Sequence, residues 1–91
     1  MTVVELKNLT DEMREEFQIP PYYQDMQLRN LAKEGEKAVG GLNPGCDISE
    51  DLTYRMLVKN YMYYAYHHKV NEFFDNYASL ILGWQLSLIH I

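Results

Sequence analysis

Apolar residues recur at intervals of three and four along most of the chain, the spacing of one face of an α-helix. This pattern predicts helices at residues 3–17, 22–39, 50–66 and 70–86, and no stretch alternates at period two for long enough to be a strand. We therefore expect an all-α fold, a small bundle of about four helices in one domain over residues 1–86. The apolar positions expected to face the core are, helix by helix, Leu6, Leu9, Met13 and Phe17; Leu28, Leu31, Ala32, Gly35, Ala38 and Val39; Tyr54, Leu57, Val58, Tyr61, Met62 and Ala65; and Val70, Phe73, Phe74, Tyr77, Ile81 and Trp84.

Polar residues, glycines and prolines predict where these helices begin and end. Thr2 and Glu5 fit a capping box for the first helix, although Thr10 could instead begin a shorter one. Pro20-Pro21 ends the first helix, because proline removes a backbone donor and disfavours helix in the residue before it. Gly40-Gly41 supplies the end of the second.

Further signals concern the second half of the chain. Asp47 or Ser49 can cap the third helix, with Glu50 and Asp51 in its first turn. The apolar face shifts in phase at 67–69, which predicts a kink or short turn there and either an antiparallel pair or a bent rod for the last two helices.

Two features of the helix faces suggest close contacts. A glycine within a helix costs about 1 kcal/mol relative to alanine, so we expect Gly35 to allow another helix to approach closely. The third helix has a second apolar stripe opposite its core face, which in a monomer would be partly exposed. We expect that stripe to be a subunit interface, and its residues are Leu52, Met56, Tyr63 and Tyr66.

Composition agrees with a small protein that gains burial from a partner. A chain of 91 residues has a thin core, and its eight tyrosines are a residue type common both in small cores and at interfaces. The net charge of −5 has the wrong sign for a protein that neutralises phosphates, and the eight Lys and Arg residues look scattered along the sequence.

Candidate chemical groups lack the partners that catalysis or metal binding requires. Cys46 is the only cysteine, and the adjacent pair His67-His68 points in two directions on a helix. The carboxylate pairs Glu15-Glu16 and Glu50-Asp51 have no apolar surroundings to separate their pKa values. We expect no enzyme activity, no cofactor and no metal.

Two expectations concern the ends and the location of the chain. The first residues lack the apolar segment of a signal peptide, and no apolar run approaches the roughly 18 residues of a membrane span, so we expect no membrane contact. Residues 86–91 are what ctg tct ctt ata cac atc encodes, which resembles a transposon end used in preparing sequencing libraries. We expect 87–91 to be non-native; the alternative is an ordinary apolar helix end.

Residues 60–77 resemble the C-terminal half of the small head-tail connector proteins of tailed bacteriophages, also called DNA-packaging or head completion proteins. Tyr64-Ala65-Tyr66 and Phe74-Asp75-Asn76-Tyr77 match stretches of that family, whereas His67-His68 stands where the family has paired asparagines. The amphipathic first helix that ends in an Ile-Pro step and the Gly/Pro/Asp loop before the third helix also match.

The resemblance implies an all-helical virion protein at the head-tail junction, assembled in the bacterial cytoplasm. It would form a homo-oligomeric ring below the portal protein, complete the DNA-filled head and receive the tail proteins, while DNA passes through without specific binding. An alternative is a small helical DNA-binding or antitoxin-type regulator, which a cluster of basic residues on one helix would indicate. A small enzyme subunit is a third possibility.

Overall fold

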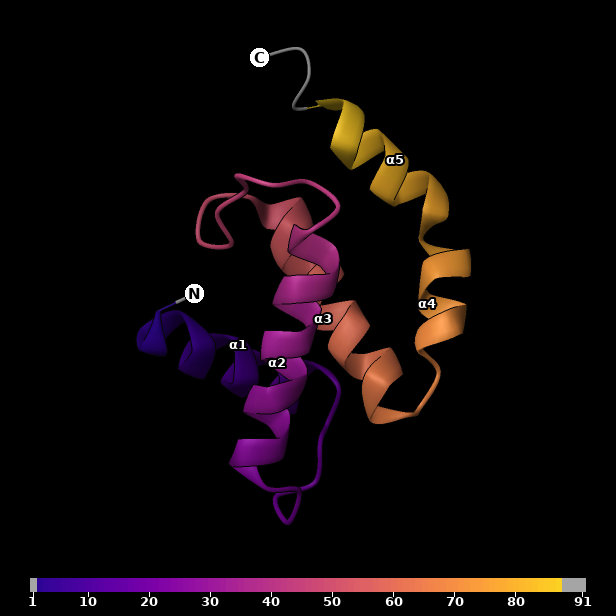
Figure 1. Ribbon diagram of the computed structural model, residues 1–91. Helices are drawn as coiled ribbons and strands as arrows, with labels where there is room; N and C mark the ends of the chain where they lie inside the picture. The colour runs from indigo at the N-terminus through magenta and orange to yellow at the C-terminus, as the bar shows by residue number, and fades with distance from the viewer. Residues whose placement is uncertain (1, 88–91) are drawn as a thin grey trace.

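The computed structural model describes residues 2–87, and this part of the chain is all-helical (Figure 1). The expected all-α fold is confirmed, with five helices rather than about four. Most of the segment expected to be non-native, residues 88–91, lies outside the described range. The helices are α1 Val3–Glu16, α2 Asp25–Gly40, α3 Leu52–Tyr66, α4 Val70–Asn76 and α5 Ala78–Ser87.

Helix α3 lies at the centre and packs against the four other helices, with α1 and α2 on one side and α4 and α5 on the other (Figure 1). The expected core faces are buried in large part, since helical spacing brings them onto one side of each helix. Ile19 and Ile48, in the connections before α2 and α3, are also buried and were not expected in the core. The buried helical residues are Leu9, Thr10, Met13, Leu28, Ala32, Gly35, Val39, Tyr54, Leu57, Val58, Tyr61, Met62, Phe73, Ile81 and Trp84.

At Gly35, helix α2 packs closely against α3. A β-carbon built on it would lie 3.2 Å from Tyr61 Cδ1 and 3.2 Å from Val58 Cγ1. Those distances are tighter than ordinary van der Waals contact, so the space is occupied. The expected close packing at Gly35 is confirmed.

Helix α1 begins as a capping box predicts. The Thr2 hydroxyl accepts a hydrogen bond from the Glu5 amide at 3.1 Å, and it also lies 3.1 Å from the Glu5 carboxylate. Thr10 is inside the helix, where its hydroxyl donates to the Lys7 carbonyl, so the alternative start at Thr10 is wrong. The helix ends at Glu16, before the prolines.

Helix α2 begins at Asp25, three residues later than the first expected position. The Arg14 guanidinium donates hydrogen bonds to the carbonyl oxygens of Pro20 and Tyr23 and to the carboxylate of Asp25. These three bonds hold residues 20–24 as a turn outside the helix. The three contacts lie on segments separated in sequence, so the spacing of apolar residues could not indicate them.

Helix α3 is capped by Asp51, which corrects the expectation of a cap at Asp47 or Ser49. The Asp51 carboxylate accepts from the Tyr54 amide at 3.0 Å, so Glu50 and Asp51 precede the helix instead of forming its first turn. Asp47 instead accepts from the amide and the hydroxyl of Ser49 and closes a local turn. Asp47 and Asp51 are both residue types that can cap a helix. The carboxylate of Asp47 is engaged in its local turn with Ser49, and the carboxylate of Asp51 caps α3.

The expected break at 67–69 is confirmed, because α3 ends at Tyr66 and His68 adopts a left-handed backbone conformation with φ of 59°. The helix expected at 70–86 is divided at Tyr77 into α4 and α5, which corrects the single-helix expectation. At this bend the Tyr77 hydroxyl donates to Asn60 Oδ1 at 3.1 Å. Helices α4 and α5 run back along α3 in the antiparallel direction (Figure 1). We call them together the α4–α5 arm, and it bends at Tyr77.

Candidate interaction surfaces

Aromatic rings pack between α3, the end of α1 and the connection that follows α1. We call this group the aromatic seam; its members are Phe17, Tyr23, Tyr63, Tyr66 and His67. The rings of Phe17 and Tyr63 stack with centroids 4.4 Å apart, and those of Tyr23 and Tyr66 meet edge to face at 4.9 Å. His67 adds edge contacts to Tyr63 and Tyr66. Such pairs stabilise by about 0.5–1.5 kcal/mol beyond their area burial.

This seam uses part of the stripe expected to be a subunit interface. Met56 and Tyr63 are half-buried against the chain's own core, Tyr66 is half-buried against Tyr23, and only Leu52 is largely free, with 77% of its surface exposed. The proposed subunit contact at these four residues stays a prediction. Three of them already have partners within the chain that sequence spacing could not show.

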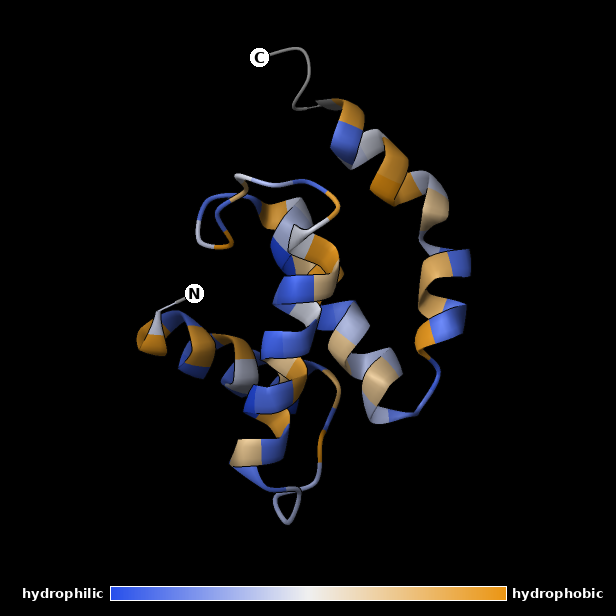
Figure 2. Cartoon of the chain, in the orientation of Figure 1, coloured by the Kyte–Doolittle hydropathy of each residue, from blue (hydrophilic) through white to orange (hydrophobic). Residues whose placement is uncertain are grey.

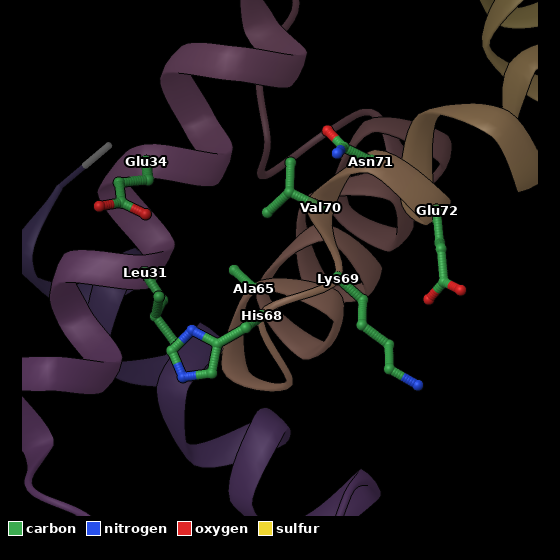
Figure 3. Close-up of a pocket in the computed structure, with 8 residues that line it drawn as sticks. All are labelled: Leu31, Glu34, Ala65, His68, Lys69, Val70, Asn71 and Glu72. Carbon is green, nitrogen blue, oxygen red and sulfur yellow. The ribbon is translucent and has the colours of Figure 1, made fainter.

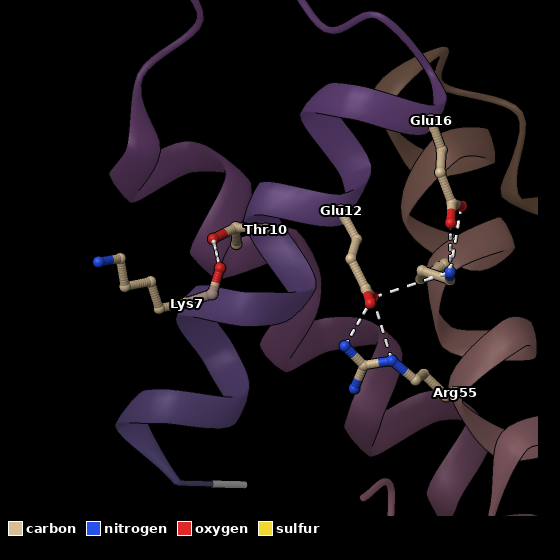
Figure 4. Close-up of polar contacts among 6 residues, drawn as sticks. Lys7, Thr10, Glu12, Glu16 and Arg55 are labelled. Atoms are coloured by element: carbon tan, nitrogen blue, oxygen red, sulfur yellow. Dashed lines mark hydrogen bonds and ion pairs between the residues drawn. The ribbon is translucent and has the colours of Figure 1, made fainter.

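An ionic cluster joins α1 to α3 next to the seam (Figure 4). Glu12 Oε2 lies 2.6 Å from Arg55 Nη2 and 3.8 Å from Lys59 Nζ, and Lys59 Nζ lies 2.9 Å from Glu16 Oε1. The two cations are less than one-fifth exposed, so solvent screens them less than a surface pair. These charges are engaged in holding the fold.

A recess of about 680 Å³ lies between α2 and the α3–α4 turn (Figure 3). Leu31, Ala65 and Val70 supply apolar lining, and Glu34 and His68 are among the polar groups around it. Residues 2–87 hold no group of three His, Cys, Asp or Glu side chains placed to bind a metal ion. The recess is open to solvent and has no arrangement of groups that defines a ligand.

The single thiol lies beside the cap of α3. Burial raises the pKa of Cys46, and the charge of Asp51 raises it further. A thiol with a raised pKa holds little thiolate at neutral pH, and thiolate is the reactive form. The surroundings of Cys46 therefore do not activate its thiol as a nucleophile.

Three cations share the exposed side of α2. Arg29, Lys33 and Lys37 are spaced four residues apart, which places them on one face, and all three are exposed. None forms an ion pair or a side-chain hydrogen bond within the described residues. We call this the basic face of α2; Figure 2 shows hydrophilic and hydrophobic residues alternating along this helix.

The basic face corrects the expectation that the basic residues are scattered. Arg29, Lys33 and Lys37 are spaced by four residues in the sequence, and this spacing places them on one face of the expected helix 22–39. The three cations look scattered along the linear sequence because three other residues separate each from the next.

The α4–α5 arm has a different outer side. Glu72 and Asp75 are exposed, and neither forms an ion pair within residues 2–87. Further along, Leu82 is 56% and Leu86 47% exposed. We call these four exposed residues the outer face of the arm, acidic on α4 and apolar on α5.

Comparisons with known proteins give no relative from which a function could be carried over. The chain matches no family model, no curated protein and no solved structure. Within residues 2–87 no helix combines the length and the hydrophobicity needed to cross a membrane.

Proposed function

We propose that this chain is a structural protein of a tailed-phage virion, a head-tail connector subunit. It assembles with copies of itself into a ring below the portal, completes the DNA-filled head and joins it to the tail proteins. The observation that carries the proposal is the uncovered apolar surface of α5.

Helix α5 is apolar on almost every side, but the described part of the chain covers only one of them. Ile81 and Trp84 are buried toward α3, whereas Leu80, Leu82 and Leu86 are 41%, 56% and 47% exposed. A helix that is hydrophobic all round is normally buried on all sides. A second protein surface would supply the missing burial, as assembly into a ring does for each subunit.

The sequence supports a connector ring as the assembly that covers α5. The tyrosine-rich stretch at 60–77 resembles the connector family, and that stretch forms the end of α3, the turn and α4. A small domain buries a lower share of its surface than a large one and gains stability from association. A net charge of −5 suits a ring through which DNA slides without being held.

Two observations test the proposal. Portal, major capsid and tail genes should neighbour this gene, and a genome without them would contradict the proposal. The purified chain, mixed with the portal protein encoded beside it, should co-sediment with the portal and appear in electron micrographs as a ring on one of its ends. A chain that remains monomeric and does not bind the portal would overturn the proposal.

The basic face of α2 favours one alternative, a small helical DNA-binding regulator. A cluster of cations on one helix face is a feature that such a function uses. Binding to double-stranded DNA should then weaken steeply with salt, because each phosphate contact releases counterions. The acidity of the whole chain opposes this alternative.

A further inference from the structure

We infer that the basic face of α2 is one half of a head-to-tail contact, and that the outer face of the arm of a second copy is the other half. This inference rests on the proposed function, because it names the surfaces by which one ring subunit would bind the next. It follows from the position and the charge of the two faces, and from the order of charged and apolar residues along each.

The two faces lie on helices that α3 separates, and Glu72 is among the residues that line the recess facing Leu31 and Glu34 of α2. Residues Leu28, Ala32 and Val39 of α2 are buried toward α3, and Phe73 of α4 is buried toward α3 from its other side. Helix α3 lies between them, and α2 has no contact with α4 or α5 in the described part of the chain (Figure 1). In Figure 3 the Glu72 side chain points away from α2. The two faces cannot meet within one chain.

Their charges are complementary. Arg29, Lys33 and Lys37 present three cations without acidic partners, and Glu72 and Asp75 present two carboxylates without basic partners. Two different surfaces that match one another, and not themselves, define a heterologous contact, which closes into a ring when the rotation between subunits permits. A second copy of the chain is therefore the occupant that fits.

Their apolar parts are also compatible. Met26 stands one turn before Arg29 on the same side of α2 and is 72% exposed, while Leu82 and Leu86 continue the outer face of the arm beyond the carboxylates. Along α2, Met26 to Lys37 spans roughly 17 Å at 1.5 Å of rise per residue. The arm bends at Tyr77, so its two carboxylates lie on α4 and its two leucines on α5. The order of residues along each face lets cations meet carboxylates while the methionine and leucine side chains share the apolar part.

Charge reversal tests the contact directly. In the basic-face variant Arg29, Lys33 and Lys37 are changed to glutamate; in the arm variant Glu72 and Asp75 are changed to lysine. All five positions are exposed, so both variants should keep native helix content by circular dichroism. Each should raise the concentration for half-assembly in sedimentation by about 100-fold or more, because like charges then oppose each other across the contact.

Rescue separates a contact from an effect of net charge. A chain carrying both sets of changes should assemble again, and an equal mixture of the basic-face and arm variants should form alternating assemblies. The matched control reverses Asp11 and Glu15, two exposed carboxylates on α1 with no partner among the described residues, and should assemble as the native chain does. Native assembly should also weaken as salt rises.

Several results would overturn the inference. Native assembly by either reversed variant, no rescue in the doubly changed chain, or loss of assembly in the Asp11 and Glu15 control would each do so. So would a basic-face variant that assembles normally but loses binding to a double-stranded DNA oligonucleotide, since that face would then contact nucleic acid.

The inference and the proposed function fail in different ways. If the native chain assembles through these faces but does not bind the portal, the contact stands and the connector function fails. If rings form on the portal and the reversed variants form them equally well, the connector function stands and this contact is wrong.

Discussion

The indole nitrogen of Trp84 donates a hydrogen bond to Asp51 Oδ2 at 2.8 Å, while Oδ1 of the same carboxylate accepts from the backbone amide of Tyr54 at 3.0 Å. One side chain therefore caps α3 and holds the far end of the α4–α5 arm. The Trp84 ring also stacks on that of Tyr54, with centroids 5.5 Å apart.

Replacing this carboxylate should destabilise both elements. Asp51→Ala removes the cap, which costs about 1 kcal/mol, and takes the acceptor from a buried indole N–H, which costs about 1–3 kcal/mol more. We expect the free energy of unfolding in urea to fall by about 2–4 kcal/mol. Asp47→Ala is the control, because its bonds to Ser49 are local and exposed; an equal loss in both variants would contradict the special position of Asp51.

The same carboxylate should make stability depend on pH. Burial disfavours its charge, but hydrogen bonds from Trp84, Tyr54 and other groups outweigh burial and lower the pKa of Asp51. Because the folded pKa lies below the unfolded value of about 3.9, this stabilisation is present above that pH and is lost as pH falls through the folded pKa. The difference in unfolding free energy between native protein and Asp51→Asn should shrink below about pH 4. A constant difference across that range would be evidence against it.

Two glycines within helices should respond in opposite ways to a side chain. Gly35→Leu should cost about 1–3 kcal/mol, because Tyr61 and Val58 occupy the space. Gly83→Ala should stabilise α5 by about 0.5–1 kcal/mol, since nothing lies within 4 Å of an added β-carbon and alanine favours helix. Thermal melts measure both, and an unchanged melting temperature for Gly35→Leu would refute the close approach of α2 to α3.

The two ends of the outer stripe of α3 should behave differently. Tyr63→Ala removes the ring stacked on Phe17 and should lower the free energy of unfolding by about 2–4 kcal/mol, as for other truncations of packed aromatic residues. Leu52→Ala should change it by less than about 0.5 kcal/mol, because Leu52 is 77% exposed. Chemical denaturation of the unassembled chain compares them, and similar losses in both would show that Leu52 packs within the chain.

The sequence predicted the repeating parts of this fold better than its exceptions. The spacing of Leu9 and Met13, or of Leu57 and Val58, is enough to identify the buried face of a helix, because that face depends on local periodicity alone. The break at Tyr77 and the late start of α2 depend on contacts with Asn60 and Arg14, which lie in other helices. Periodicity contains no information on such contacts.

The candidate surfaces follow the same division. The basic face of α2 follows from a spacing of four residues between its cations, a local pattern that the sequence contains. Tyr63 was expected on an outer stripe of α3, but it packs against the core, and the Phe17 ring at the end of α1 stacks on it. Whether an apolar stripe is free for a partner depends on tertiary packing, so the sequence alone could not settle it.

Head completion measures the proposed function most directly. Heads would be purified from cells infected with a phage whose copy of this gene is disrupted, then incubated with the purified chain and with tails. We expect DNA-filled heads that lack tails before addition, and tail attachment with restored infectivity after it, with no restoration by the basic-face variant. Heads that join tails and infect equally well without this chain would contradict the connector function.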